Sequence, residues 1–173
     1  MMIASCVTST QKNVRFWITP HANLVNVVST NRNVNTSMTR IITSNERMMR
    51  MAREKQFENK IKEYLKSQGC YFIKYWGGGE FTKAGVPDIL CCCDGFFIGI
   101  EVKAEKGKPS ALQIHNLEQI GKAGGFGLLV YPKDFTLFKN LIECIKKMDC
   151  DNMMYNYSIF KHNIQEWKKK LEV

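Results

Sequence analysis

Two apolar runs separated by a tight turn form the most regular pattern in this chain. Residues 89–93 and 96–102 are apolar at nearly every position, and Asp94-Gly95 lies between them. An Asp-Gly pair favours a two-residue type I′ turn, because both central residues of that turn need positive φ. The pattern therefore predicts a β-hairpin. Both of its faces are apolar, which is typical of strands in the centre of an α/β sheet.

Further elements along the chain would cover such a sheet. Apolar residues at helical spacing predict a helix over Ala52–Gln68, and Cys70–Tyr75 is expected to form a strand. After the hairpin come three predicted elements: a helix over Ala111–Lys122, a buried strand over Phe126–Tyr131 and a helix over Phe135–Met148. Because a helix connects the hairpin to the next strand, that strand should run parallel to its neighbour. The predicted fold class is α/β, a central mixed sheet of about four strands flanked by helices (α-β-β-β-α-β).

Composition divides the chain into three parts. Residues 1–50 are rich in Asn, Ser and Thr, contain one acidic residue and show no sustained period. We expect a disordered tail or sequence upstream of the native start there, although a transit peptide has a similar composition. Residues 51–148 are predicted to form the main domain. Residues 149–173 are predicted to be an extension with a peripheral strand or loop and a short helix, suited to a dimer or nucleic-acid contact.

Charge, apolar content and cysteine spacing narrow the class of protein. The net charge of +9 over 173 residues is compatible with a polyanionic partner. No apolar run is long enough for a membrane span, so we expect no membrane association. Seven irregularly spaced cysteines argue against a disulfide framework and are expected to be buried thiols in a reducing cytoplasm. A weaker alternative is that the run of cysteines at residues 91–93 and the loop glycines form a redox or metal-sulfur site.

The hairpin register places two acidic residues opposite each other. If Asp94 and Gly95 form the loop, the pairing continues outward until Asp88 faces Glu101. Directly opposed residues have Cβ atoms about 4.5–5.5 Å apart, and like charges there are destabilising. Lys103 lies on the same strand face as Glu101, because side chains alternate along a strand. A hard divalent cation such as Mg²⁺, which prefers oxygen ligands, best explains this cluster.

At these residues the chain resembles a known group of enzymes. Pro87-Asp88, then twelve residues, then Glu101-Val102-Lys103 is similar to the signature of the PD-(D/E)xK nuclease superfamily. The Gly-Val-Pro-Asp lead-in, the Ile-Glu-Val-Lys strand and Gln113 more specifically resemble the virus-type replication-repair nuclease (VRR-NUC) domain, which occurs in phages and bacteria. The resemblance covers about residues 51–132. It implies a restriction-endonuclease-like core and a metal-dependent nuclease that hydrolyses DNA phosphodiester bonds.

The resemblance also implies roles for individual residues. Asp88 and Glu101 would bind Mg²⁺ or Mn²⁺, with the backbone carbonyl of Val102 as a further ligand. Lys103 would position a water molecule or stabilise charge on the phosphate, and Gln113 would hydrogen-bond that water or the phosphate. An acidic residue on the first helix joins the metal cluster in this superfamily. Glu58 is the candidate here, with Glu54 as its competitor one turn earlier.

Four lysines near these residues are candidates for phosphate contacts. Lys74 and Lys83 flank a glycine-rich loop, and Lys106 and Lys108 lie in the polar loop after the hairpin. The resemblance implies branched or flap DNA as substrate, inside a bacterium or a phage-infected cell, and symmetric cutting of two strands would call for a homodimer. The alternative is a catalytically silent nucleic-acid-binding module. Such a module would not need acidic and basic residues in this register.

Overall fold

The computed structural model describes residues 15–17, 26–28, 32–77 and 83–171. The chain divides into two compact units, residues 1–48 and residues 49–173. In the first unit, β1 (Arg15–Trp17) and β2 (Asn26–Val28) pair antiparallel. Helix α1 (Arg32–Ser67) begins in the first unit and ends in the second. All further elements belong to the second unit.

A four-stranded mixed sheet forms the centre of the second unit, in the order β3-β4-β5-β6. Strand β4 (Ile89–Cys93) pairs antiparallel with β3 (Tyr71–Lys74) on one side and with β5 (Phe96–Val102) on the other. Helix α2 (Ala111–Lys122) then leads to β6 (Phe126–Val130), which pairs parallel with β5. These findings confirm the predicted α/β class and element order, and the arrangement is consistent with a restriction-endonuclease-like fold.

The hairpin register follows the turn that the sequence predicted. Asp94 and Gly95 have φ values of 46° and 87°, both positive, as a type I′ turn requires. The ladder runs from the pair Cys93↔Phe96 to the pair Ile89↔Ile100. Lys146, at the end of α3 (Phe135–Lys146), forms an ion pair of 2.8 Å with Asp94. The predicted register of the hairpin is therefore confirmed.

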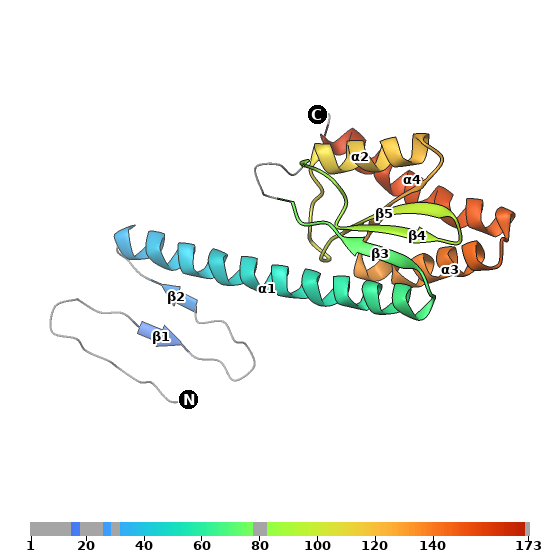
Figure 1. The fold of residues 1–173 in the computed structure, drawn as a ribbon. Coiled ribbons are helices and arrows are strands. Elements are labelled where there is room, and N and C mark those ends of the chain that lie inside the picture. The colour runs from blue at the N-terminus through green and yellow to red at the C-terminus, as the bar shows by residue number, and fades with distance from the viewer. Residues whose placement is uncertain (1–14, 18–25, 29–31, 78–82, 172–173) are drawn as a thin grey trace. The chain divides into compact units, whose positions relative to one another are not determined.

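Helices cover both faces of the sheet. Helices α1 and α3 lie on one face and α2 lies on the other (Figure 1). The main core cluster includes Phe57, Ile61 and Leu65 of α1, Phe138, Leu141, Ile142 and Ile145 of α3, and Ile89, Ile98, Ile100 and Leu128 of the sheet. A smaller cluster of Ile114, Leu117, Leu129, Tyr131 and Ile164 lies on the α2 side. Gly127 lets α2 come close to β6, because a Cβ there would lie 2.1 Å from the Leu117 carbonyl oxygen.

Helix α1 begins at Arg32, earlier than the predicted start at Ala52. Residues 45–53 are exposed, so this part of the helix buries no apolar stripe for periodicity to detect. Residues 32–67 contain no Gly or Pro that would interrupt a helix. The nature of residues 1–50 as a tail stays a prediction.

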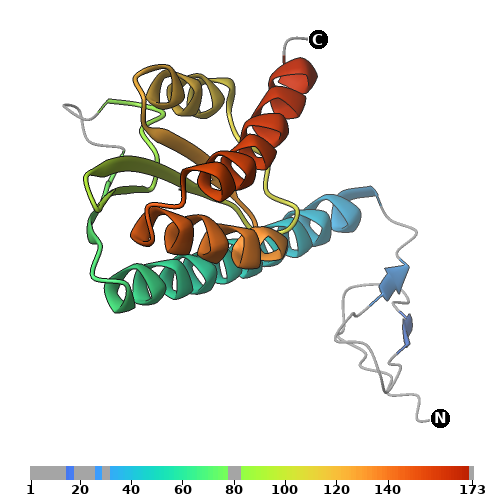
Figure 2. The ribbon, with the colours of Figure 1, turned by 90° about the vertical axis from the view of Figure 1, so that its right-hand side faces the viewer.

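The prediction of a strand or loop and a short helix near the C-terminus was wrong. Residues 150–171 form one long helix, α4 (Cys150–Leu171), whose buried residues include Met153, Tyr157, Phe160 and Ile164. Their spacing is helical, but the exposed apolar side chains of Met154 and Tyr155 obscure it in the sequence. Helix α4 contacts β6, α2 and α3 (Figure 2). The Tyr157 hydroxyl accepts a hydrogen bond from the Gly127 N–H at 3.4 Å, so α4 covers the β6 edge of the sheet.

One pair of cysteines departs from the expectation of free thiols. Cys70 and Cys93 form a disulfide, because the β3–β4 register carries Cys70 opposite Cys93 with Cα atoms 4.7 Å apart. The long connection between β3 and β4 hides this register in the sequence. Cys91, Cys92, Cys144 and Cys150 are free. Within the described ranges, no helix combines the length and the apolar character needed to cross a membrane.

Candidate active site

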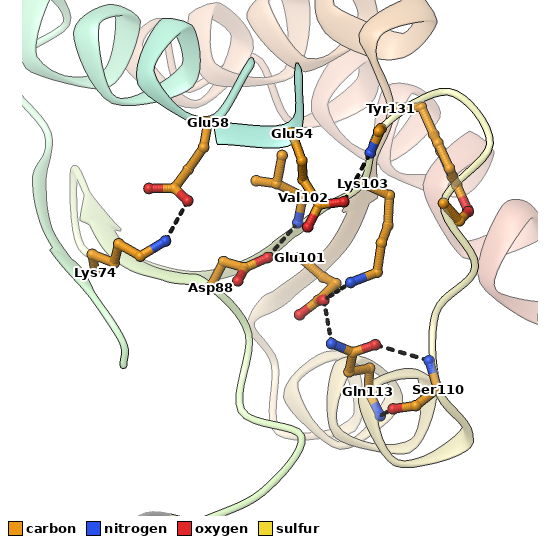
Figure 3. A network of polar contacts seen from close by, with 12 residues as sticks. Glu54, Glu58, Lys74, Asp88, Glu101, Val102, Lys103, Ser110, Gln113 and Tyr131 are labelled. Atoms are coloured by element: carbon orange, nitrogen blue, oxygen red, sulfur yellow. Dashed lines mark hydrogen bonds and ion pairs between the residues drawn. The ribbon is translucent and has the colours of Figure 1, made fainter. Parts of the chain in front are cut away.

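Acidic, basic and amide side chains meet where β5 ends (Figure 3). Asp88 directly precedes β4, Glu101 and Lys103 come from the end of β5, and Gln113 comes from the first turn of α2. Helix α1 contributes two more carboxylates from the other face of the sheet. Glu101 lies at the centre of this group, and only 1% of its surface is exposed.

The Asp88 carboxylate is held against the last residues of β5. The backbone N–H of Val102 donates to Asp88 Oδ2 at 2.9 Å. The ladder between β4 and β5 ends at Ile89↔Ile100, so the Asp88 side chain meets a backbone donor that has no partner in that ladder. The negative charge of Asp88 acts on Glu101 and raises the pKa of Glu101. The structure thus brings together the two carboxylates that the hairpin register predicted to meet.

The two carboxylate oxygens of Glu101 differ in their surroundings. The Lys103 ammonium and the Gln113 side-chain amide both donate to Oε1. Oε2 is buried and has no hydrogen-bond partner among the described residues. Burial, followed by the charge of Asp88, raises the pKa of Glu101 to about 7, although the Lys103 ammonium opposes this shift and Glu54 adds to it. Glu101 is therefore a carboxyl group that titrates near neutral pH.

Gln113 is positioned by the cap of its own helix. Its backbone N–H donates to Ser110 Oγ at 3.2 Å, and its side-chain Oε1 accepts from the Ser110 N–H at 2.8 Å. This capping box leaves the Gln113 amide nitrogen pointing to Glu101. The sequence predicted a contact with water or phosphate at Gln113, whereas the contact in the structure is with a carboxylate.

The two acidic residues of α1 have different partners. Glu58 is buried and forms ion pairs with Lys62, at 2.8 Å, and with Lys74. Burial raises the pKa of Glu58, but the hydrogen bonds and charges of Lys62 and Lys74 outweigh it and leave that pKa lowered. Glu54 instead accepts a hydrogen bond from the Ala104 N–H at 3.2 Å. Glu54 thus contacts the backbone next to Lys103, and its charge adds to the rise in the pKa of Glu101 that burial and Asp88 cause.

The four lysines predicted to contact phosphate differ in their surroundings. Lys74 pairs with Glu58 and lies 4.8 Å from the ring centroid of Trp76. Lys83, Lys106 and Lys108 are exposed. No sequence motif points to Tyr131, whose hydroxyl donates to the Gly107 carbonyl at 3.2 Å and so holds the loop between Lys103 and α2.

Oxygen donors at the site match the preferences of a hard cation. Among the described residues, no three or more His, Cys, Asp or Glu side chains form a metal-binding group. Two carboxylates are nevertheless close, and one buried oxygen, Glu101 Oε2, has no described partner. The N–H and C=O of one strand residue point to the same edge, so the Val102 carbonyl faces the Asp88 side. Asp88, Glu101 and the Val102 carbonyl are therefore the oxygens that fit Mg²⁺.

Comparison with known proteins agrees with this geometry. The family model of the archaeal Holliday junction resolvases (Hjc) matches residues 49–125, a range that contains both α1 carboxylates, Asp88, Glu101, Lys103 and Gln113. No curated protein and no solved structure matches the chain. The match gives no support to the narrower virus-type identification or to a phage or bacterial origin. Residues 49–125 are thus similar to the archaeal Holliday junction resolvases, a family of PD-(D/E)xK-type nucleases.

Proposed function

We propose that this protein is a divalent-metal-dependent endodeoxyribonuclease that cleaves branched DNA. The observation that carries the proposal is the buried Glu101 carboxylate, which has one unpartnered oxygen and lies beside Asp88 and Lys103. The single Lys103 ammonium offsets only one of the two neighbouring carboxylate charges, Asp88 and Glu101, and an uncompensated buried charge is costly. This arrangement is therefore favoured when a cation joins it. The name of the matched family supports a Holliday junction as the branched substrate.

Asp88, Glu101 and the Val102 carbonyl would hold Mg²⁺, with Mn²⁺ as a substitute. When bound, the ion supplies Lewis-acid polarisation of the scissile phosphate and activation of the attacking water. The ionised form of Glu101 is the form that binds a cation, so metal binding lowers the pKa of this carboxyl and releases its proton.

The remaining residues position these groups or offset charge. The Lys103 ammonium now neutralises Glu101 Oε1 and is placed to stabilise charge that develops on the phosphate. Gln113 keeps the Glu101 carboxylate in one orientation. Glu54 would add a third negative charge near the cation, and Glu58 pairs with Lys74, a candidate phosphate contact. The direct binding of metal by Glu58, which the sequence predicted, stays a prediction.

An Asp88→Asn variant tests the proposed function. Labelled linear, flap and four-way DNA substrates are incubated with the wild type and the variant, in Mg²⁺ and in EDTA. We expect the wild type to cut a branched substrate in Mg²⁺ and not in EDTA. The variant should cut the same substrate at least about 100-fold more slowly, while its Kd for the DNA stays unchanged. Asp94→Asn, at the turn end of the same hairpin, is the matched control and should keep full activity.

Two results would contradict the proposal. Cleavage that continues in EDTA would exclude a metal-dependent reaction. Binding of branched DNA by the wild type without any cleavage would instead support the catalytically silent nucleic-acid-binding module.

We further propose that the active form is a homodimer, because one chain provides one site and symmetric cleavage of two strands needs two sites. Analytical ultracentrifugation of the protein with and without a four-way junction tests this. A single copy of the chain on a junction that is cut in both strands would rule it out.

A further inference from the structure

The last turn of α4 carries three consecutive lysines and lies outside the region matched by the resolvase family. This turn is fixed against α2. Gln165 Nε2 donates to Glu118 Oε1 at 2.8 Å, and Lys168 forms an ion pair of 3.2 Å with Glu118. Figure 1 shows the C-terminal end of α4 beside α2, the helix that carries Gln113 into the site.

A chain of contacts joins this turn to the loop that follows Lys103. The Lys170 ammonium lies 5.2 Å from the ring centroid of Trp167. Trp167 packs on the α2-side cluster, which includes Tyr131. Tyr131 in turn donates to the Gly107 carbonyl at 3.2 Å. The end of α4 and the loop are therefore held together.

Gly107 lies between two exposed lysines, Lys106 and Lys108. Lys169 is 74% exposed at its side chain, and its ion pair with Glu166, at 3.0 Å, is a weak surface contact within one helix turn. The five lysines of the loop and the α4 end outnumber the four glutamates that neighbour them in the sequence or pair with them, which are Glu105, Glu118, Glu166 and Glu172. The combined surface has a net positive charge.

We propose that Lys106, Lys108, Lys169 and Lys170 form one phosphate-binding surface, here called the basic shoulder, for a duplex arm of the DNA. This inference rests on the proposed function, because it takes the DNA cut at Glu101 to be branched. One arm of the branched DNA lies at the site, and a second arm lies on the shoulder. Ammonium groups on an exposed surface suit the phosphate backbone, whose contacts depend on charge and not on base sequence.

Lysines at the C-terminal end of a helix also stabilise the helix through its macrodipole. That effect is local to α4 and predicts a change in thermal stability without a change in DNA binding. A basic shoulder predicts the opposite pattern. The two explanations are therefore separable by experiment.

The test is a Lys169→Gln/Lys170→Gln variant of the full chain, with Lys168 retained for its contact with Glu118. Fluorescence anisotropy measures the Kd for a labelled four-way junction in EDTA over a range of salt concentrations. We expect the Kd to rise, and the slope of log Kd against log salt to fall by up to about 2, since each phosphate contact contributes about 0.9.

Lys161→Gln is the matched control. The Lys161 ammonium also lies over an aromatic ring, 5.7 Å from the centroid of Tyr157, on the same helix. Nine residues separate it from Lys170, which places it on the opposite side of α4 and away from the loop. Its loss should leave both the Kd and the salt slope unchanged.

An unchanged Kd and salt slope in the double variant would overturn the basic shoulder, whether or not the melting temperature falls. If the double variant does not fold, a Lys106→Gln/Lys108→Gln variant of the loop is measured in the same way, with the same expected loss. Wild-type protein that binds the junction without cutting it would contradict the proposed function alone. The salt slopes would still decide whether the shoulder binds DNA.

Discussion

The Gln113 side-chain amide donates to Glu101 Oε1, the same oxygen that accepts the Lys103 ammonium. The other end of the Gln113 amide accepts from the Ser110 N–H. One residue therefore caps α2 and fixes the most buried carboxylate of the site. The start of this helix and the orientation of Glu101 are coupled through a single side chain.

Gln113→Leu should reduce both activity and stability. The substitution removes the donor to Glu101 and half of the capping box. Loss of a group that orients a metal-binding residue typically lowers metal affinity or activity by about 10–100-fold. We expect the cleavage rate to fall by a factor in this range. The measurement is single-turnover cleavage of a four-way junction together with urea unfolding.

Ser110→Ala is the matched control for Gln113. It removes the hydroxyl that accepts from the Gln113 N–H, at a cost of about 1 kcal/mol in the free energy of unfolding, but it keeps the amide on Glu101. Its cleavage rate should stay close to that of the wild type. Equal losses of rate in the two variants would show that Gln113 acts only through helix stability.

The raised pKa of Glu101 predicts a pH-dependent loss of stability without metal. In the folded protein this carboxyl keeps its proton up to about pH 7, whereas in the unfolded chain it releases the proton near the ordinary glutamate pKa of 4.5. The protonated Glu101 carboxyl therefore makes its full contribution to the free energy of unfolding below the pKa of the unfolded chain. That contribution is lost as the pH rises through the pKa of the folded protein. The loss is about 3 kcal/mol of the free energy of unfolding.

Glu101→Gln removes this titration. Urea unfolding in EDTA should show the variant gaining stability relative to the wild type as pH rises from about 5 to about 8. Mg²⁺ should stabilise the wild type at the higher pH and have little effect on the variant, because a ligand that binds the folded state stabilises it. Parallel pH curves for the two proteins would show that Glu101 ionises normally.

Glu54→Gln and Glu58→Gln form a matched pair on one helix, one turn apart. Gln at residue 54 still accepts from the Ala104 N–H but no longer adds charge near Glu101. We expect about a 10-fold loss of Mg²⁺ affinity for this variant and a smaller change for Glu58→Gln. Isothermal titration calorimetry measures both. The reverse order would support Glu58 as the metal-binding residue that the sequence predicted.

Gly127→Ala should destabilise the second unit. A Cβ at this position would lie 2.1 Å from the Leu117 carbonyl oxygen, so α2 and β6 must move apart. Overpacking of this kind costs about 1–3 kcal/mol, which urea unfolding detects. Gly77→Ala serves as the control, since its Cβ would meet nothing closer than 4.0 Å. Equal midpoints for the two variants would mean that the close approach of helix and strand is not limiting.

The parts of the structure that local chemistry determines could be predicted from the sequence. The Asp94-Gly95 turn sets the hairpin register by itself, and the register in turn places Asp88 beside the end of β5. Lys103 follows from alternation along the strand, since it shares a face with Glu101. No distant residue is needed for any of these steps.

The remaining features depend on contacts between distant segments. Glu54 approaches Ala104 over fifty residues of sequence, and this contact depends on the packing of α1 on the sheet. Cys70 meets Cys93 through a strand register that no tight turn specifies. Helix α4 was missed because its exposed apolar side chains resemble its buried ones in sequence.

The hydrogen bond from Gly127 to the Tyr157 hydroxyl also limits how copies of this chain can assemble. With α4 sealing the β6 side, β3 is the remaining flank of the sheet in the described part of the second unit. If two copies pair through β3, neither copy keeps a free sheet edge in this part of the chain. Such an assembly therefore stops at a dimer and cannot grow into a filament.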